Sequence, residues 1–339
     1  MESSSLLTYL KNHFPNRNSL QMFDFKDITS GWETQIFSFN LEWFSDNGKE
    51  SDELILRVYA PGISEKAERE AFVMKKLSEI GYPVPKIHLL EKDDSILGHP
   101  FIIMNRISGS TLEELNSKPN ADRKKWANLF SRLFVDLHNL DWTYLVSNPL
   151  IIPQDDPYFI INATLVDYKD TLDRFRKSEL NPILEWLKAR VDRVPCQKVS
   201  ITHGDFHPMN ILIDEDENPF VIDWGASRVS DFRTDLAWTL LLTRAYSTQK
   251  NRDSILNGYQ SITGHEIEEI DYFEVLAILR RLLDVLISMG NGPISRGLRK
   301  GAVPLMKEQM GHIEVVYNLL HELTDIRIPK VEDWIDRFT

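Results

Sequence analysis

Three oxygen-bearing side chains, Asp205, Asn210 and Asp223, lie in one short stretch of the sequence at spacings that could support chemistry. Two apolar runs, 211–213 and 220–222, separate Asn210 from Asp223, and a polar bend joins the two runs. This pattern predicts a β-hairpin. With the turn at the centre of the bend, Asn210 would face Asp223 across the open end of the hairpin. Because such oxygens suit Mg²⁺ that also binds substrate phosphates, the pattern indicates phosphoryl transfer.

The surrounding residues extend this pattern into a longer motif. A protein-kinase catalytic loop is H-R-D-x-x-x-x-N, followed later by D-F-G; its first Asp accepts the hydroxyl proton, while the Asn and the second Asp hold Mg²⁺. Here the run H-G-D-F-H-P-M-N spans 203–210 and D-W-G spans 223–225. With Gly after the His, the motif resembles the aminoglycoside phosphotransferase and choline-kinase-like group of small-molecule kinases. The resemblance implies that Asp205 is the catalytic base and that Asn210 and Asp223 bind Mg²⁺.

Length and composition fit such an enzyme. A chain of 339 residues is too long for one compact core, and its single cysteine, Cys196, indicates a reducing compartment, so we expect a cytoplasmic protein. We find no signal peptide and no run of about 20 apolar residues, so we expect no membrane association. The net charge of −12 argues against nucleic acid as a ligand. It is compatible with a cationic substrate, although acidic surfaces also serve solubility.

The predicted elements follow the order found in a kinase. Strands are expected first, then a helix ended by Gly81, then more strands, and from residue 112 onward mainly helices apart from the hairpin. We therefore predict an α+β, protein-kinase-like fold with two lobes. Residues 1–104 would form the nucleotide-binding lobe, 105–109 the hinge, and 110–339 the catalytic and substrate-binding lobe. The first lobe would consist of strands at 23–28, 35–43, 54–59, 86–90 and 101–105, a hairpin turn at 45–48, and helices at 1–14 and 65–80.

The third expected strand of the first lobe contains Arg57. Kinases place a phosphate-binding Lys in this strand and pair it with a Glu on the following helix. The resemblance implies Glu70 as the partner, with Glu68 as the alternate. Arg stays charged and forks across oxygens, but it is bulkier than Lys. This substitution is the one feature that favours a nucleotide-binding pseudokinase without turnover.

Two further segments are candidates for nucleotide binding. The turn containing Ser30 and Gly31 could cover the phosphates, because Gly lets backbone N–H groups approach phosphate oxygens, although Ser-Gly also forms ordinary hairpins. The resemblance implies that the base of ATP (or GTP) pairs with the C=O of Asn105 and the N–H of Ile107. No G-x-G-x-x-G or Walker A motif occurs, which excludes Rossmann and P-loop sites.

The phosphate acceptor is expected to be a small hydroxyl-bearing metabolite or antibiotic, neutral or cationic. The acidic residues predicted to face it are Asp155, Asp156 and Asp231. Asp235 follows Thr234 at the start of a predicted helix, so N-capping explains one of the pair. Alternatively, Asp235 stabilises the catalytic loop or contacts the substrate.

The prediction is thus a kinase that transfers the γ-phosphoryl group of ATP (or GTP) to a hydroxyl group, acting as a monomer or homodimer. The pseudokinase is the main alternative. A metal-dependent hydrolase built on His203, Asp205 and His207 is a weaker one, because it leaves the pairing of Arg57 with Glu70 unexplained.

Overall fold

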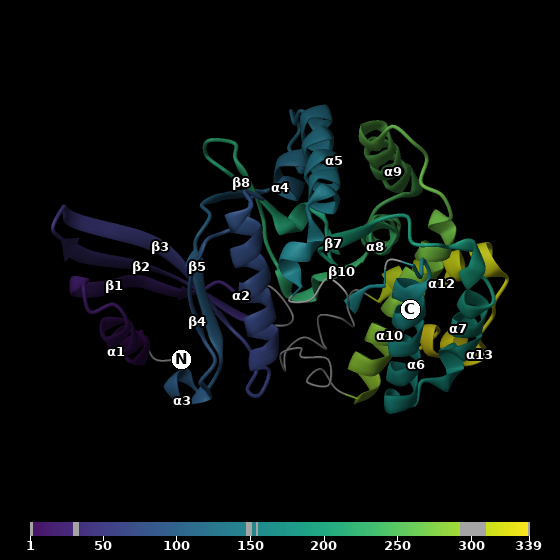
Figure 1. The fold of residues 1–339 in the computed structure, drawn as a ribbon, viewed down its shortest axis with the longest axis horizontal. Coiled ribbons are helices and arrows are strands. Elements are labelled where there is room, and N and C mark those ends of the chain that lie inside the picture. Colours follow the sequence, from purple (N-terminus) through teal and green to yellow (C-terminus); the bar gives the residue numbers. More distant parts are fainter. Residues whose placement is uncertain (1–2, 30–33, 147–150, 154, 292–309, 338–339) are drawn as a thin grey trace. The chain divides into compact units, whose positions relative to one another are not determined.

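The computed structural model describes two compact units (Figure 1). The first contains the described residues up to Thr111 together with Ile211–Gly225. The second contains Leu112–Asn210 and the described residues from Ala226 onward. The hairpin therefore packs with the first unit, and the expected division at residues 105–109 stays a prediction. The residues that the structure describes are 3–29, 34–146, 151–153, 155–291 and 310–337.

The first unit is built on an antiparallel sheet with the strand order β1-β2-β3-β5-β4. The predicted turn between β2 and β3 is present, because Ser45 pairs with Gly48. The elements around this sheet are α1 (Ser3–His13), β1 (Asn18–Asp27), β2 (Gln35–Ser45), β3 (Gly48–Val58), α2 (Ser64–Glu79), β4 (Ile87–Glu91), α3 (Asp94–Leu97) and β5 (Phe101–Asn105).

The two faces of this sheet carry different side chains, since neighbouring residues of a strand point to opposite faces. Leu54, Leu56 and Val58 of β3 join the apolar core that contains α1. Arg57 lies between them in sequence and contacts Glu70 of α2, on the other face. Strand alternation therefore turns the one cation of this stretch away from the apolar core and toward α2.

A second, smaller sheet in the first unit has the order β6-β8-β9 and contains the predicted hairpin. Gly109 of β6 pairs with Asp214, and a Cβ atom at Gly109 would lie 1.9 Å from the carbonyl oxygen of Ile213. Only glycine fits there, so the link after β5 can approach the hairpin closely. The strands are β6 (Gly109–Thr111), β8 (Ile211–Asp214) and β9 (Pro219–Val221).

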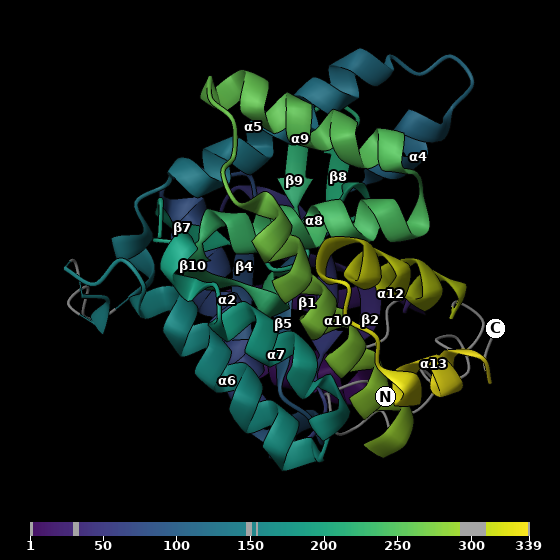
Figure 2. The same cartoon turned by 90° about the vertical axis from the view of Figure 1, so that its right-hand side faces the viewer.

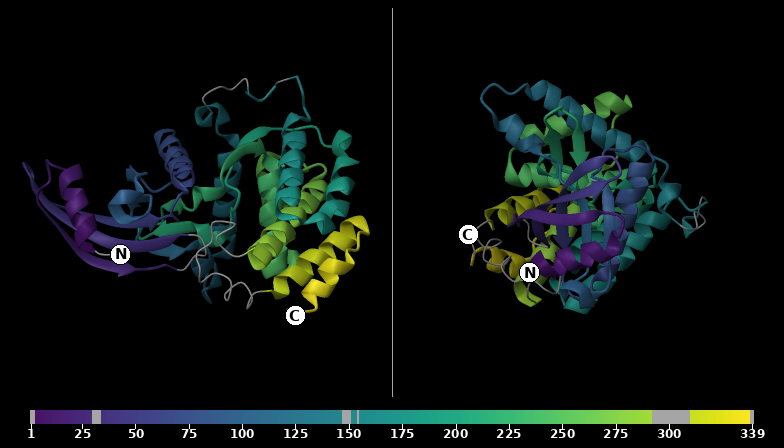
Figure 3. Two further views of the ribbon diagram at one scale, coloured as in Figure 1. Left: turned by 90° about the horizontal axis from the view of Figure 1, so that it is seen from below. Right: turned by 90° about the vertical axis from the view of Figure 1, so that its left-hand side faces the viewer.

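The second unit is mainly helical (Figure 2). Helices α8 and α10 pack against each other, α9 packs on α5, and the last helices, α12 and α13, lie side by side at the yellow end of the chain (Figure 3). Strands β7 and β10 pair antiparallel. The elements are α4 (Leu112–Ser117), α5 (Arg123–Asn139), α6 (Phe159–Phe175), α7 (Asn181–Lys188), β7 (Val199–Thr202), β10 (Arg228–Asp231), α8 (Phe232–Tyr246), α9 (Gln249–Thr263), α10 (Ile270–Asn291), α12 (Gly311–Thr324) and α13 (Pro329–Ile335).

The predicted α+β class, with an N-terminal antiparallel sheet and a mainly helical remainder, is confirmed. The strands β6, β7 and β10 were not predicted. Each is only three or four residues long, and so short a run carries too little periodicity to distinguish it from a loop. None of the described helices is both long enough and apolar enough to span a bilayer.

Candidate active site

The hairpin that follows Asn210 forms in a register one residue away from the predicted one. Ile211 pairs with Val221, whereas a register facing Asn210 with Asp223 would pair Ile211 with Ile222. The predicted register is therefore wrong by one residue. The side chain of Asp214 determines the turn, because its Oδ1 accepts hydrogen bonds from the backbone N–H groups of residues 216 and 218.

The segment after β9 holds Asp223 in a backbone conformation that few residues adopt. Its φ is +68°, in the left-handed region, which costs energy for a residue with a Cβ. The neighbouring Trp224 is fully buried, and its indole N–H donates to the Val221 carbonyl at 3.0 Å. Arg69 donates to the Gly225 carbonyl, also at 3.0 Å. These contacts hold the strained turn in place, so it presents the Asp223 carboxylate partly exposed.

Arg57 joins two carboxylates in the first unit. Its Nη1 lies 3.3 Å from Glu70 Oε1, and its Nη2 donates to Asp223 Oδ1 at 2.6 Å. Tyr59 donates its hydroxyl to Glu70 Oε2 at 2.6 Å. Glu68, the alternate partner, instead lies on the surface, 3.3 Å from Lys92. We call Arg57, Glu70 and Asp223 the phosphate-side cluster.

Burial sets the electrostatics of the phosphate-side cluster, since Arg57 is 6% and Glu70 1% exposed. Burial alone would lower the pKa of Arg57, but the charges of Asp223 and Glu70 raise it well above its ordinary value. Burial raises the pKa of Glu70, and Arg57 opposes that rise. A buried cation with charged partners on both sides cannot lose one of them cheaply. The Nε atom of Arg57 is also buried and lacks a hydrogen-bond partner among the described residues.

Asp205 in the second unit is held by side chains from two elements. The indole N–H of Trp238, on α8, donates to Oδ1 at 2.9 Å, and His207 Nε2 lies 3.4 Å from Oδ2. Burial would raise the pKa of Asp205, but His207, Trp238 and the charge of Arg280 hold it well below its usual range. Asp205 is therefore a carboxylate at neutral pH, able to accept a hydrogen bond from a hydroxyl group.

Asn210 is oriented by the same loop. Its Nδ2 donates to the backbone carbonyl of Asp205 at 2.9 Å and lies 3.1 Å from His207 Nε2. With the amide nitrogen so engaged, the side-chain oxygen is the group left for a metal. Asn210 offers one amide oxygen in the second unit and Asp223 one carboxylate in the first, and their shared binding of Mg²⁺ stays a prediction. No group of three or more His, Cys, Asp or Glu residues within the described ranges could hold a metal by itself.

Asp235 anchors the start of the loop at 203–210. Its Oδ2 accepts from the backbone N–H of His203 at 2.6 Å, and its Oδ1 accepts from that of Gly204 at 2.8 Å. His138 Nε2 lies 3.3 Å from Oδ2, and the hydroxyl of Tyr259 lies 2.8 Å from His138 Nδ1. Burial would raise the pKa of Asp235, but these partners lower it. Asp235 is 1% exposed, so its carboxylate is shielded from solvent. Its partners are the backbone amides of His203 and Gly204 and the ring of His138.

Gly204 is required by the backbone of the same loop. Its φ is +81°, and a Cβ atom there would lie 2.5 Å from the carbonyl oxygen of Ala226. An Arg at this position, as protein kinases have, would collide with the chain.

The other predicted substrate residues lie in different settings. Asp231 is buried as the N-cap of α8 and pairs with Arg233 at 2.7 Å. Asp155 and Asp156 are exposed, and Asp156 accepts from the N–H of Tyr158 just before α6. Their role toward a substrate stays a prediction.

The predicted nucleotide contacts are described in part. Ser30 and Gly31 lie outside the described residues. Asn105 ends β5, and its side chain contacts His88. Among the described residues, the N–H of Ile107 has no hydrogen-bond partner, which leaves it available to a ligand.

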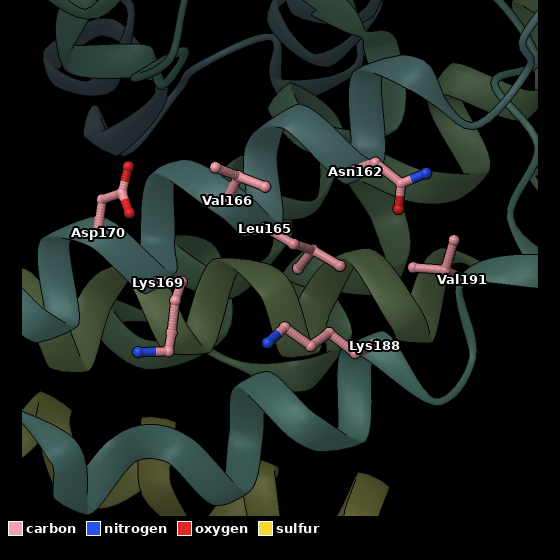
Figure 4. A pocket seen from close by; sticks show the side chains of 7 residues that line it. All are labelled: Asn162, Leu165, Val166, Lys169, Asp170, Lys188 and Val191. Atoms are coloured by element: carbon pink, nitrogen blue, oxygen red, sulfur yellow. The ribbon is translucent and has the colours of Figure 1, made fainter.

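A hollow of about 470 Å³ lies elsewhere in the second unit (Figure 4). It contains none of the predicted site residues, and its Lys169 is paired with Asp173 on the same helix. The lining residues, from α6, α7 and the turn that follows, are Asn162, Leu165, Val166, Lys169, Asp170, Lys188 and Val191.

Sequence reasoning missed the residues that support Asp205. Trp238 of α8 donates its indole N–H to Asp205 Oδ1 at 2.9 Å. Arg280 and Arg281 were not singled out, although both occur in the apolar run of α10, L-A-I-L-R-R-L-L. Two adjacent arginines inside an apolar run could have indicated a site, since a charge placed in apolar surroundings needs a compensating partner.

The sequence of this chain is similar to those of known proteins. Residues 24–272 match the phosphotransferase enzyme family. Mouse (Mus musculus) acyl-CoA dehydrogenase family members 11 and 10 are 24% and 25% identical over 242 and 178 residues, which are 69% and 51% of this chain. The matches cover 30% and 16% of those two proteins, so the chain spans less than a third of their length.

Solved structures of related fold come from two kinds of kinase. The ternary complex of a thermostable mutant of aminoglycoside phosphotransferase APH(4)-Ia with ADP and hygromycin B superposes with a TM-score of 0.58 at 15% identity, covering 92% of this chain and 98% of that one. Plasmodium vivax ethanolamine kinase gives a TM-score of 0.57 at 16% identity, covering 95% and 89%. These likenesses confirm the predicted kinase-like fold.

Proposed function

Because the chain belongs to the phosphotransferase enzyme family, we propose that it transfers the γ-phosphoryl group of ATP (or GTP) to a hydroxyl group of a small molecule. The observation that carries the proposal is the phosphate-side cluster. Arg57 and Asp223 are 166 residues apart in sequence, yet they share a hydrogen bond beside Glu70. A strand cation, a helix acid and the acid after the hairpin are among the parts that kinases use for phosphoryl transfer.

The acceptor side of the reaction rests on Asp205. A substrate hydroxyl would donate to this carboxylate, and its proton would pass to Asp205 as the hydroxyl oxygen bonds to the γ-phosphorus. The bond from that phosphorus to the β–γ bridging oxygen breaks, and ADP leaves with the electron pair. The lowered pKa of Asp205 makes it a weak base. Its main contribution would therefore be orientation of the hydroxyl, which fits a transfer dominated by positioning.

The nucleotide side rests on Asn210, Asp223 and Arg57. Asn210 and Asp223 would hold Mg²⁺, which when bound neutralises charge on the β- and γ-phosphates. Arg57, buried against Glu70, would direct its guanidinium at phosphate oxygens. Ser30 and Gly31 would cover the phosphates, and the backbone of Asn105 and Ile107 would pair with the base. The N–H of Ile107, which has no hydrogen-bond partner among the described residues, supports the last assignment.

The pseudokinase alternative also has an observation in its favour. Arg57 already occupies Oδ1 of Asp223 at 2.6 Å, so the carboxylate that should bind Mg²⁺ is neutralised by protein. A protein that binds nucleotide without turnover would tolerate this arrangement. The hydrolase alternative loses support, because His203 is fully buried under the catalytic loop.

The test is formation of ADP from MgATP, or of GDP from MgGTP, by the full chain, measured with and without a panel of hydroxyl compounds. A kinase forms ADP in proportion to a phosphorylated acceptor. A hydrolase forms ADP and phosphate without any acceptor. Nucleotide binding with no ADP under any condition would identify a pseudokinase and overturn the proposal.

A further inference from the structure

Asp205 lies near a cation of α10, Arg280. The ring of Trp238, whose N–H donates to Asp205 Oδ1, carries the guanidinium of Arg280 on its face, 3.7 Å from the ring centroid. The charge of Arg280 contributes to lowering the pKa of Asp205. One indole therefore joins the proposed catalytic carboxylate to an arginine of α10.

The next residue of α10 adds a second cation. Arg281 Nη2 donates to the hydroxyl of Tyr246 at 2.5 Å, and its Nε donates to His312 Nε2 at 3.1 Å. Tyr246 stacks on His312, with ring centroids 4.7 Å apart. Neither partner carries a formal negative charge, because Tyr246 is a neutral phenol and His312 accepts through its ring nitrogen. We call Arg280 and Arg281 the α10 arginine pair.

Among the described residues, Arg281 forms no ion pair with a carboxylate and Arg280 forms one long pair, although the charge of Asp205 acts on both. Within the described ranges, the carboxylate in ion-pair reach of Arg280 is Asp284, whose Oδ2 lies 3.8 Å from Nε. Burial lowers the pKa of Arg281, and Arg280 lowers it further, while Tyr246 and Asp205 oppose the change. Adjacent guanidinium groups in an apolar helix are costly to desolvate, and a bound anion would offset that cost.

A third guanidinium lies nearby. Arg228 of β10 and Arg280 line one small hollow together with Trp238, Tyr168 and Thr234. Arginine forks match carboxylate and phosphate oxygens in two-point contacts. At about 10 Å³ this hollow has room for about one water, so it shows that Arg228 lies near Arg280 but does not itself enclose an anion.

We propose that the phosphate acceptor is an anionic hydroxyl compound, a hydroxy acid or a hydroxylated phosphate ester, whose anionic group binds the α10 arginine pair while its hydroxyl lies at Asp205. This inference rests on the proposed kinase function and names its substrate class. It reverses the neutral or cationic charge expected from the sequence. The acidic net charge of −12 describes the whole surface, whereas these cations are local to Asp205.

Charge discrimination follows from the same residues. An ammonium group placed beside Arg280 and Arg281 would meet two like charges in a partly desolvated setting, which disfavours cationic acceptors. A carboxylate there gains two charged donors. The arginines therefore select among hydroxyl compounds by charge, in addition to any fit of shape.

Binding of three probes with one carbon skeleton tests the proposal without requiring turnover. D-glycerate, glycerol and 3-amino-1,2-propanediol differ in charge but share adjacent hydroxyl-bearing carbons. Their binding to the full chain with MgADP is measured by saturation-transfer NMR up to millimolar concentration. We expect D-glycerate to bind roughly tenfold more tightly than the amine, and more weakly as salt rises.

Substitutions of single arginines test whether D-glycerate binds at the α10 arginine pair. Arg280→Gln should weaken D-glycerate binding by roughly tenfold, and Arg280→Lys, which keeps the charge, should restore part of it. Arg190→Gln is the matched control, because Arg190 lies 4.2 Å from the ring centroid of Trp186 in the same kind of stack, in a turn that contains no predicted site residue. Melting temperatures identify any variant that fails to fold, and Arg281→Gln then serves as the second test.

Three results would overturn the proposal: no detectable D-glycerate binding, binding of the amine at least as tight, or equal loss in Arg190→Gln and Arg280→Gln. ADP formation is recorded separately. A chain that binds D-glycerate through Arg280 but never forms ADP would refute the kinase function and leave the anion site standing. If ADP formed only with cationic acceptors, the anion site would be refuted and the kinase function would stand.

Discussion

Arg57 donates a hydrogen bond to Asp223 at 2.6 Å while its other terminal nitrogen lies 3.3 Å from Glu70. The carboxylate that would bind Mg²⁺ is thus shared with the cation that would bind phosphate. Loading of MgATP would require Arg57 to exchange Asp223 for a phosphate oxygen. A forked guanidinium can do this while keeping Glu70, since its second arm is already held there.

The coupling between Arg57 and Glu70 can be measured with a double-mutant cycle. Arg57→Ala should raise the KM for ATP and lower kcat, and Glu70→Ala should act in the same direction. Because both are buried in one ion pair, the double variant should lose less than the sum, by about 0.5–3 kcal/mol in transition-state free energy. Glu68→Ala, on the exposed side of the same helix, is the control and should change little. Fully additive losses would mean that the pair does not act together.

Asp205→Asn should lower transfer by roughly 10²-fold or more and leave MgATP affinity nearly unchanged. The amide keeps the shape and the Trp238 contact at Oδ1 but cannot accept the hydroxyl proton. Acceptor phosphorylation and fluorescent-nucleotide titration measure the two effects separately. Nucleotide affinity that collapses together with the rate would reassign Asp205 to the metal.

Asp223→Ala should weaken Mg²⁺-dependent nucleotide binding, and Asn210→Ala should weaken it less, because an amide oxygen carries no full charge toward the metal. Titration of Mg²⁺ at fixed ATP gives the apparent metal affinity of each variant. The Asp223 variant also leaves Arg57 without one of its carboxylates, so its melting temperature should be compared with that of Arg57→Ala. An unchanged Mg²⁺ dependence in both variants would remove these residues from the metal site.

Asp235→Asn should destabilise the protein by about 1–3 kcal/mol and lower kcat, because the buried carboxylate accepts from both His203 and Gly204 amides. Denaturant unfolding measures the stability, and kcat with unchanged KM for ATP reports misplacement of Asp205. Asp192→Asn changes an exposed acid of the same unit that has no predicted role in the site, and it should be neutral. If both variants are equally stable and active, the anchoring role of Asp235 is refuted.

The pH dependence of kcat should show no loss attributable to Asp205 between about pH 8 and pH 5. Its folded-state pKa is depressed, so the active carboxylate persists as pH falls and is lost only below the ordinary range for Asp. Trp238→Phe removes one hydrogen bond that lowers this pKa and should move the acid limb to higher pH. Identical profiles for the wild-type chain and this variant would show that Trp238 does not tune Asp205.

Local sequence determined much of this protein. Strand alternation around Arg57 and the Ser45–Gly48 turn predicted the hairpin of β2 and β3, and the periodicity of residues 65–80 predicted the helix now seen as Ser64–Glu79. These features depend on neighbours two to four residues apart, so periodicity carries them. The H-G-D-F-H-P-M-N run carried the family for the same reason, because its spacing is local.

Tertiary structure decided which side chains meet across long separations in the chain. Trp238 lies 33 residues from Asp205, and Tyr259 lies 121 residues from His138; in both pairs the partner is chosen by how α8 and α9 pack. The hairpin register differed by one residue, because the Asp214 hydrogen bonds decide where the turn lies and composition alone does not. The charge around Asp205 could not be read from a net charge of −12. Electrostatic interactions act between residues near in space, and only packing places Arg280 on the face of Trp238.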